Sequence, residues 1–321
     1  MKPKIFVSVI ITTYRRYDNI EKIIFKLLQN YLNFKHFEIL ICDSFLINYP
    51  NKIKSLINKY PNLNIRYFNI DKNVHSIKRN IGIENSNGEI LIFLDDDCYP
   101  EKNFVKDFYK LIKKIKYQKV ILSGSVKYEN LTDKFRSYRQ SRQFCYDKSL
   151  FISNKEINPK NIVTMNFACK RNDIHNNLVF EERFNRYGFE DYEFAYRAKK
   201  KNFKLLSCGV RVTHKDERPF SIFLNKISFL ALEGMNYLKK INISAAKKNN
   251  FYRLENNLFI KSILNLKLTH IILKKLIKFF ITLDKYRLSN FFMYKLSIAL
   301  AYLYGVSCRK HKDKSTLMWY K

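Results

Sequence analysis

The first hundred residues alternate between two hydrophobic patterns, and this alternation restricts the fold more than any other feature of the sequence. Near-continuous apolar, β-branched runs are typical of strands that are buried on both faces of a parallel sheet. Four such runs occur, at Ile5–Thr12, Phe37–Cys42, Ile65–Phe68 and Glu89–Leu94. Because segments with apolar residues at helical spacing separate these runs, the pattern indicates right-handed βαβ units and an α/β fold with a mostly parallel sheet.

The later sequence continues this pattern less regularly. Asp18-x-x-Glu21 resembles a capping box and predicts a helix that begins there. Further helices are predicted at about residues 53–60, 74–84, 104–115 and 188–200, and further strands at Val120–Val126, Ile162–Cys169 and Leu205–Val212. The region 128–160 is polar and predicts no regular element. After about residue 219 the pattern changes to helices rich in Leu, Ile, Phe and Lys.

The charge balance is strongly basic, with 60 Lys and Arg against 28 Asp and Glu. A net charge of +32 favours anionic partners such as nucleotide phosphates, nucleic acid or an acidic membrane surface. The abundance of Lys, Asn, Ile, Phe and Tyr beside scarce Gly is also typical of codon bias toward AT-rich DNA. The charge alone therefore leaves both interpretations open.

The six cysteines argue against a zinc site, because no two of them stand at C-x-x-C spacing. Several lie inside apolar, strand-like runs, which predicts reduced, buried thiols in a cytoplasmic protein. The N-terminal residues lead directly into a predicted strand without the apolar region of a signal peptide. We therefore expect a cytoplasmic location, with peripheral contact at the inner face of the membrane as a further option.

Three consecutive carboxylates, Asp95, Asp96 and Asp97, directly follow the strand at Glu89–Leu94. Such carboxylates repel one another, so a folded structure needs a cation to hold them together. Mg²⁺ or Mn²⁺ prefers oxygen ligands and commonly binds one or two carboxylates together with substrate phosphates. Ligands bind parallel sheets beyond the carboxyl ends of the strands. Because Asp43 also follows a predicted strand, it should share one crevice with the acidic run.

A second acidic pair, Glu190 and Asp191, begins the helix predicted after Gly188. Asp191 shares its helical face with apolar residues three, four and seven positions later, so its carboxylate should lie at the edge of a buried surface. A carboxylate in that place is suited to act as a general base. Ordinary helix capping by acidic residues is the alternative interpretation.

Two single residues have weaker signals. Arg79 lies in a short polar helix near the predicted strand ends, where it could contact a base or a phosphate or remain a solvated surface charge. His214 follows a predicted strand, and this position favours ligation of the same metal, although a lone His more often has a structural role.

The ordered set of these segments resembles glycosyltransferase family 2, which has a GT-A fold. The segments that carry the resemblance are Val7–Arg16, Glu38–Asp43, Arg79–Gly82, Gly88–Asp97 and Gly188–Asp191 with Phe194 and Arg197. They occur in the family's order and at about its spacing, over roughly residues 4 to 215. The resemblance implies an inverting transfer of a sugar from a nucleotide-diphosphate donor, UDP-linked, onto an acceptor hydroxyl.

The resemblance also implies roles for particular residues. Thr12, Tyr14, Asp43 and Arg79 would surround the nucleotide base. Asp95 and Asp96 would lie near the ribose and the metal, and Asp97 would bind Mn²⁺ or Mg²⁺ with Asp95 and His214. Asp191 would be the catalytic base, with Glu190 beside it. Residues 166–171 would line the acceptor side, where a glycan, a lipid-linked sugar or a protein would bind.

One departure from the family pattern concerns the second motif. Family members commonly continue it as Asp-Asp-Gly-Ser, whereas Asp43 is followed here by Ser44-Phe45. The resemblance therefore does not define the contacts to the base and sugar at this point.

The resemblance divides the chain into a catalytic domain at 1–218 and a helical extension at 219–321. The catalytic domain has a nucleotide-binding half at about 1–100 and an acceptor half at about 101–218. In the extension, residues 271–280 are too rich in Lys to cross a bilayer, and the apolar run Ser297–Val306 is too short. These helices would pack on the catalytic domain, pair with a second subunit, or bind an anionic membrane surface.

Two rival functions remain at this stage. A sugar-phosphate nucleotidyltransferase would carry a Gly-rich loop after the first strand, but residues 12–16 contain no glycine. A basic, non-catalytic protein that binds anionic membrane or nucleic acid would suit the charge. No zinc-finger or RNP-like motif marks the sequence, so we expect no specific nucleic acid partner.

Overall fold

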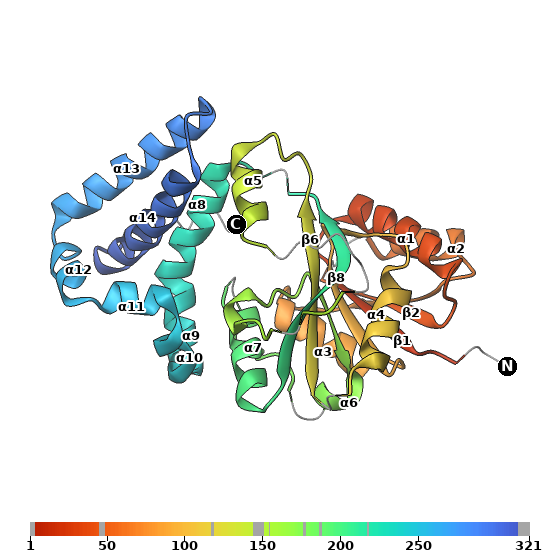
Figure 1. Cartoon of the computed structure of the whole chain (residues 1–321). Helices are drawn as coiled ribbons and strands as arrows, with labels where there is room; N and C mark the ends of the chain where they lie inside the picture. The colour runs from red at the N-terminus through yellow and green to blue at the C-terminus, as the bar shows by residue number, and fades with distance from the viewer. Residues whose placement is uncertain are drawn as a thin grey trace. The chain divides into compact units, whose positions relative to one another are not determined.

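The structure is a computed structural model of the chain (Figure 1). It describes residues 4–44, 49–116, 119–143, 151–153, 155–175, 178–185, 188–216 and 218–313. These residues divide into two compact units. Unit 1 contains the described residues of 1–129, 142–185 and 190–216, and unit 2 contains those of 130–141, 186–189 and 217–321.

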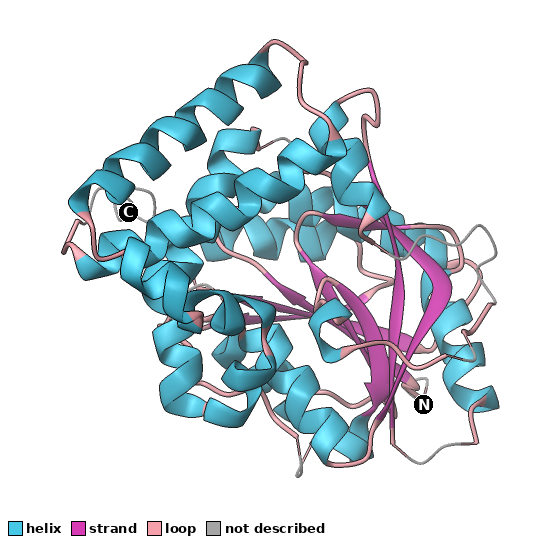
Figure 2. Cartoon of the chain, turned by 60° about the vertical axis from the view of Figure 1, so that its left-hand side comes forward, coloured by secondary structure: helices cyan, strands magenta, loops and turns pink. Residues whose placement is uncertain are grey.

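Unit 1 is built on one twisted, eight-stranded sheet (Figure 2). Its strands are β1 (Val7–Thr12), β2 (Phe37–Asp43), β3 (Asn64–Asn69), β4 (Ile90–Asp95), β5 (Cys98–Pro100), β6 (Val120–Tyr128), β7 (Asn166–Lys170) and β8 (Lys204–His214). The order across the sheet is β3-β2-β1-β4-β7-β6-β8-β5. The first four of these strands are parallel, β7 is antiparallel to both neighbours, and β5 is antiparallel to β8. The sheet is therefore mostly parallel, as the sequence predicts.

Helices cover both faces of this sheet, which explains why β1 is buried along its whole length. The helices of unit 1 are α1 (Tyr17–Tyr31), α2 (Tyr49–Lys59), α3 (His75–Glu84), α4 (Phe104–Lys114), α6 (Arg171–Ile174) and α7 (Glu190–Lys200), with a 3₁₀ turn η1 (Pro159–Asn161). One face packs Val9 and Ile11 against α1, α2 and α4. The other packs Ile10 against α3, α6 and α7. Alternate residues of one apolar strand thus belong to two cores.

Several expected boundaries are wrong. The N-cap of α1 is Arg16, without a side-chain capping bond, so Asp18 lies in the first turn and the capping box does not form. The strand expected from Ile162 begins only at Asn166, because η1 and the turn after it occupy the preceding residues. Helix α7 begins at Glu190 rather than at residue 188, since Gly188 has a φ of 116°. The polar region around residue 134 contains a helix that the sequence did not reveal.

Unit 2 is helical. It comprises α5 (Lys134–Ser141), α8 (Phe220–Phe229), a π-helical turn η2 (Leu230–Gly234), α9 (Met235–Ile241), α10 (Ile243–Lys248), α11 (Asn250–Asn256), α12 (Leu258–Ile263), α13 (Lys267–Lys285) and α14 (Phe291–Lys310). The backbones of α8 and α14 approach closely, since a Cβ on Gly305 would lie 2.0 Å from the Ser228 carbonyl oxygen. Buried Glu255 contacts Lys239, Arg309 and Tyr302, which ties α9, α11 and α14 together.

Helix α14 corrects the expectation that the apolar run Ser297–Val306 is too short to span a bilayer. This run lies within a helix of 20 residues, which is long and apolar enough to cross a membrane by length and composition alone. Half of its apolar window is buried inside the protein, and the core helix of a soluble protein has the same properties. The helix is therefore weak evidence for a membrane span.

Candidate functional site

The carboxyl ends of three parallel strands bring the predicted site residues to one edge of the sheet. Thr12 at the end of β1 is in register with Cys42 of β2 on one side and with Asp95 of β4 on the other. Asp43 is the last residue of β2. This register explains why residues about 30 and 80 positions apart in the sequence meet at one edge.

The three carboxylates of the acidic run, Asp95–Asp97, have different partners. The Asp96 carboxylate accepts hydrogen bonds from the Thr13 hydroxyl at 2.8 Å and from Arg16 at 2.7 Å. The same Arg16 nitrogen lies 3.0 Å from Asp97 Oδ2. Burial and the neighbouring carboxylates raise the pKa of Asp95 to about 7, although Arg79 opposes this shift. Three adjacent carboxylates are thus stabilised partly by cations of the protein itself.

Asp97 and His214 form the group that best fits a divalent cation. His214 ends β8, which pairs with β5 just after the acidic run, and its Nε2 lies 3.2 Å from Asp97 Oδ1. Both side chains are at least 86% buried, and the His214 Nδ1 is buried without a hydrogen-bond partner in the described part of the chain. The donor atoms of Asp97, His214 and Cys98 lie within 4.8 Å of one another. The carboxylate suits Mg²⁺ or Mn²⁺, whereas an imidazole is a ligand more typical of Zn²⁺, Cu²⁺, Fe or Ni.

Asp95, the third predicted metal ligand, does not belong to that three-residue group. Its carboxylate instead faces Arg79, with Asp95 Oδ1 3.6 Å from a guanidinium nitrogen. The Arg79 side chain is almost fully buried and also lies 3.1 Å from Asp191 Oδ1 and 3.9 Å from Glu190. Arg79 therefore joins the acidic run to the two carboxylates predicted for the base. At this place Arg79 can contact the nucleotide, as the resemblance implies, and it can also orient the candidate base Asp191.

Asp191 is fixed by α7 and by the turn before β7. Its carboxylate accepts hydrogen bonds from the Thr164 hydroxyl at 2.9 Å and from the Thr164 backbone N–H at 3.2 Å, besides Arg79. The side chain remains 28% exposed. A partly exposed carboxylate that is held from three sides can receive a proton from a bound hydroxyl. The adjacent Glu190 carboxylate is more buried, at 12% exposed.

The predicted nucleotide-binding residues have different environments. Asp43 is fully buried, and its carboxylate accepts hydrogen bonds from the Ser44 N–H and from the Tyr67 hydroxyl. Burial raises its pKa. Thr12 is buried, whereas Tyr14 is 37% exposed and can offer its ring to a planar base. Phe45, at the departure from the family pattern, lies outside the described residues.

Lys78 is a site residue that sequence reasoning missed. Its ammonium group is fully buried and donates hydrogen bonds to the Thr13 carbonyl and the Asn73 side chain, both at 2.7 Å. Burial lowers its pKa to about 8, while the carboxylates of Asp43 and Asp96 oppose this shift. The sequence signal that could have identified Lys78 is its position directly before Arg79 on α3. Thr164 and Arg16 were missed as well: Thr164 has no distinctive neighbourhood in the sequence, and Arg16 lies in the segment Val7–Arg16 but was given no role.

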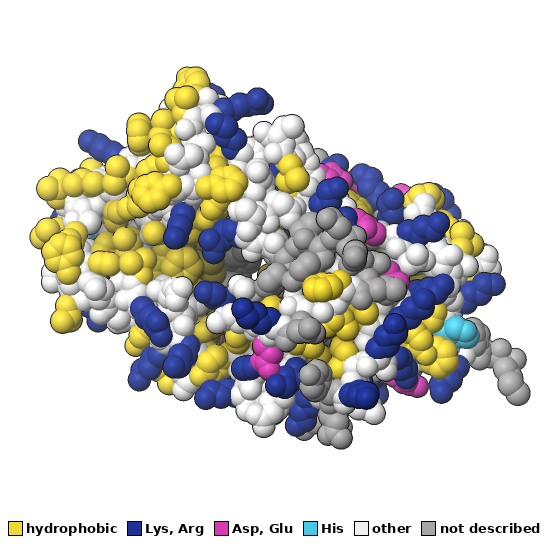
Figure 3. Space-filling model, viewed as in Figure 1, with side chains coloured by type: hydrophobic (Ala, Val, Ile, Leu, Met, Phe, Trp, Pro, Cys, Tyr) yellow, Lys and Arg dark blue, Asp and Glu magenta, His cyan; other side chains and the backbone are white. Residues whose placement is uncertain are grey.

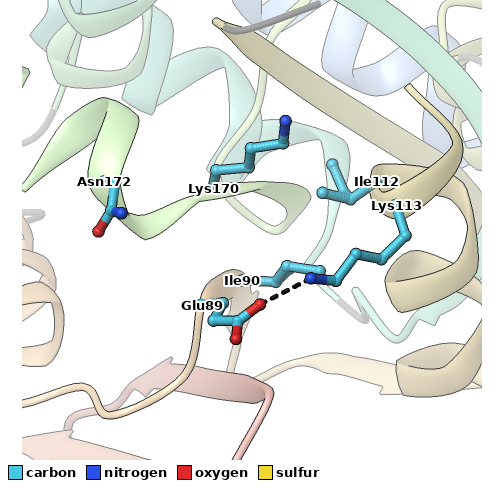
Figure 4. A pocket seen from close by; sticks show the side chains of 6 residues that line it. All are labelled: Glu89, Ile90, Ile112, Lys113, Lys170 and Asn172. Carbon is cyan, nitrogen blue, oxygen red and sulfur yellow. Dashed lines mark hydrogen bonds and ion pairs between the residues drawn. The ribbon is translucent and has the colours of Figure 1, made fainter. Parts of the chain in front are cut away.

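A small pocket lies elsewhere, at the opposite end of β4 (Figure 4). Its volume is about 300 Å³, and it is lined by Glu89, Ile90, Ile112, Lys113, Lys170 and Asn172. Lys113 and Glu89 form an ion pair with an N–O distance of 2.6 Å. Since Glu89 precedes β4 and the acidic run follows it, this pocket is separate from the candidate active site.

A comparison with protein families decides the class. Residues 8–175, more than half of the chain, match the family model described as Glycosyl transferase family 2. The chain belongs to glycosyltransferase family 2. The match begins one residue inside β1 and continues through β7, so it includes the acidic run, while α7 and β8 lie beyond it.

Relatives with known names agree with this assignment. One, from Methanococcus voltae, is dolichyl N-acetyl-alpha-D-glucosaminyl phosphate 3-beta-D-2,3-diacetamido-2,3-dideoxy-beta-D-glucuronosyltransferase. It is 33% identical over 124 residues, which are 37% of each chain. The match to the curated relatives thus spans only about a third of their length.

Solved structures show the same fold. Mannosyltransferase PcManGT from Pyrobaculum calidifontis, in complex with GDP-Man and Mn²⁺, superposes with a TM-score of 0.60 at 16% identity over 98% of this chain and 89% of that one. TarS 1-349 from S. aureus, in complex with UDP-GlcNAc, has a TM-score of 0.51 at 15% identity over 96% and 92% of the two chains. The fold of the glycosyltransferase is therefore of the GT-A type.

Proposed function

We propose that this glycosyltransferase moves a sugar from a UDP-sugar donor to an acceptor hydroxyl with inversion at the anomeric carbon. The observation that carries the proposal is the bridge through Arg79. Its guanidinium lies between Asp95, at the donor end of β4, and Asp191, at the start of α7. One buried cation thereby fixes the distance between the donor side and the candidate base.

In this proposal Asp97 and His214 hold Mn²⁺ or Mg²⁺, and Asp95, whose carboxylate faces Arg79 in this structure, turns toward the ion to add a third ligand. The short contact between His214 Nε2 and Asp97 Oδ1 supports these two ligands. The bound Mn²⁺ of PcManGT supports the same class of ion. When bound, such an ion neutralises negative charge on the departing diphosphate.

The protein residues supply the remaining steps. Thr164 and Arg79 hold the Asp191 carboxylate in place, and Asp191 takes the proton of the acceptor hydroxyl. The acceptor oxygen attacks the anomeric carbon, and the bond to the diphosphate breaks on the opposite face, with its electron pair leaving on the diphosphate. This single displacement needs no covalent intermediate. Glu190 is the adjacent carboxylate that could take over the proton.

We infer a lipid-linked sugar as the acceptor. The Methanococcus voltae relative is named for a dolichyl phosphate-linked sugar, and its similarity to this chain supports the same class of acceptor here. On the donor side, Tyr14 and the buried Asp43 offer a ring and a carboxylate to a nucleotide base. UDP-GlcNAc in TarS supports a uridine donor, and GDP-Man in PcManGT defines the competing choice.

A donor panel tests this function. Purified protein would be incubated with UDP-linked and GDP-linked sugars, with Mn²⁺ or with EDTA, and release of the nucleoside diphosphate would be measured. We expect release from a UDP-sugar that requires the metal and increases when a lipid-linked sugar is added. Glu84→Gln is a matched control, because Glu84 is an exposed carboxylate at the end of α3, away from the strand ends that form the site. Release in EDTA, or release from GDP-sugars alone, would contradict the metal or the donor assignment respectively.

A further inference from the structure

The exposed apolar side chains of the described residues are concentrated in the C-terminal helices. Leu258 is 81% exposed, Phe259 73% and Phe292 71%, and further examples follow one another along α13. Figure 3 shows hydrophobic side chains crowded over the part of the molecule that contains α11–α14, with Lys and Arg among them. Soluble proteins seldom expose contiguous apolar surface of this kind without a partner.

Helix α13 has three separate faces. Its inward face consists of Leu273, Ile277 and Phe280, which are buried at helical spacing. One outward flank, here called the apolar stripe, consists of Leu268, Ile272, Leu276 and Phe279, all exposed. The other flank, here called the lysine stripe, consists of Lys267, Lys274, Lys278 and Lys285, also exposed. The spacings of three, four and seven residues place each set along one side of the helix.

The apolar stripe continues past both ends of α13. Leu266, directly before the helix, is 58% exposed, and Leu288, three residues after it, is 63% exposed. Among the described residues, no carboxylate forms an ion pair with the lysine stripe. Asp284 is the single acidic residue of the sequence between Asn256 and Lys312, and its carboxylate accepts a hydrogen bond from the Tyr294 hydroxyl at 2.6 Å. The surface therefore combines uncovered apolar area with uncompensated positive charge.

We propose that this face of unit 2, the apolar stripe with the lysine stripe, docks on the surface of an anionic lipid bilayer. An amphipathic helix that lies in the membrane interface buries its apolar side at the acyl boundary while its lysines meet anionic headgroups. A second copy of the chain would bring lysine stripes of equal sign together, and each chain carries a net charge of +32. Nucleic acid would neutralise the lysines but leave the apolar stripe in water. An anionic bilayer matches both flanks.

The docking is peripheral. Helix α14 uses Ala301, Tyr302 and Val306 inside unit 2, and Gly305 permits close packing on the backbone of α8. Withdrawing α14 to span a membrane would expose these contacts. The proposal does not depend on the sugar-transfer reaction, since it concerns binding alone.

Co-sedimentation of the full chain with vesicles tests the proposal. Vesicles of phosphatidylcholine alone are compared with vesicles of phosphatidylcholine mixed with phosphatidylglycerol, at low and high salt. We expect binding to the mixed vesicles only, with weakening at high salt. Replacing the four residues of the lysine stripe by Gln should weaken binding at least about 100-fold, because each Lys near such a surface strengthens binding about five-fold.

Matched controls separate the stripe from total charge. Replacing Lys102, Lys110, Lys114 and Lys116 by Gln removes the same charge from exposed positions of unit 1 and should change binding little. In the same way, Leu268→Ser with Ile272→Ser and Phe279→Ser should weaken binding, whereas Phe25→Ser with Leu32→Ser should not. All of these positions are exposed, so the variants should keep the thermal stability of the parent protein.

Several results would overturn the proposal. Equal loss in both lysine variants would show that net charge alone attracts the vesicles. Sedimentation without vesicles would identify the face as a contact between copies of the chain. Protein that stays with the vesicles through a high-salt wash after both stripes are replaced would indicate insertion of α14 instead.

Discussion

Arg79 shows how one residue can serve two sides of a reaction site. A buried guanidinium needs carboxylates around it, and Asp95, Asp191 and Glu190 satisfy that need at distances of 3.1 to 3.9 Å. The same contacts orient the carboxylates that the chemistry requires. A planar, permanently charged group suits this role better than the flexible ammonium of lysine.

The base is tested by Asp191→Asn. The amide has nearly the shape of the carboxylate but cannot accept the acceptor proton, so turnover should fall by roughly 10²–10⁴-fold. The affinity for the nucleotide diphosphate should change little. Steady-state kinetics and calorimetry measure the two effects separately. Glu190→Gln is the matched variant, and a larger loss of turnover in that variant would move the base to Glu190.

The metal site is tested by Asp97→Ala. Without this carboxylate, the ion loses the ligand that lies beside His214. Mn²⁺-dependent binding of nucleotide diphosphate should therefore disappear while the fold persists. Calorimetric titration with and without Mn²⁺ measures this effect. Glu84→Ala, at an exposed position at the end of α3, is the control and should bind normally. Unchanged affinity in Asp97→Ala would place the ion elsewhere.

At the scale of elements, the acidic run acts as the end of β4. Its position was predictable because an apolar run of β-branched and aromatic residues stops where the carboxylates begin. The place of β7 was not predictable, since no local pattern shows that a strand inserts antiparallel between β4 and β6. For the same reason the contacts of Thr164 and Lys78 could not be read from the sequence. They depend on distant segments that meet only after the sheet forms.

The acidic run should also make donor binding depend on pH. Burial and like charges raise the pKa of Asp95 to about 7, so the carboxyl is protonated below that pH and ionised above it. An ion must displace the proton, so Mn²⁺-dependent affinity should fall about ten-fold per pH unit below pH 7 and level off above it. Calorimetry across this range measures the curve. Asp95→Asn should remove the step, and a step that persists in this variant would assign it to another group.

At the scale of the whole molecule, the chain consists of two compact units with different interior chemistry. Unit 1 is held by apolar strands between helices, and the sequence predicted it from periodicity and family resemblance. Unit 2 includes α5, which lies about 80 residues before its other helices in the sequence. Sequence reasoning assigned that segment to the acceptor half, because its aromatic contacts to Phe220 and Tyr294 are long-range.

We expect that a substitution can destabilise unit 2 without destabilising unit 1. Glu255→Ala would leave Arg309 and Lys239 without their buried carboxylate, at a cost of about 3 kcal/mol. Hydrogen exchange should then quicken in α9, α11 and α14 but not in β1 to β4, and binding of nucleotide diphosphate should persist. Asp18→Ala, at an exposed position of α1, is the control. Equal acceleration of exchange in β1 would show that the two units unfold together.

The antiparallel strand β7 limits how the two halves of the sheet can move relative to each other. It pairs with β4 over five residue pairs, from Ile90 opposite Lys170 to Leu94 opposite Asn166, and with β6 on its other side. A continuous ladder of backbone hydrogen bonds thus joins the strand that ends in the acidic run to the strands that lead to His214. The two halves of the sheet cannot move apart as rigid bodies without breaking these backbone hydrogen bonds. We therefore expect reactants to enter and leave through movements of the loops beyond the strand ends.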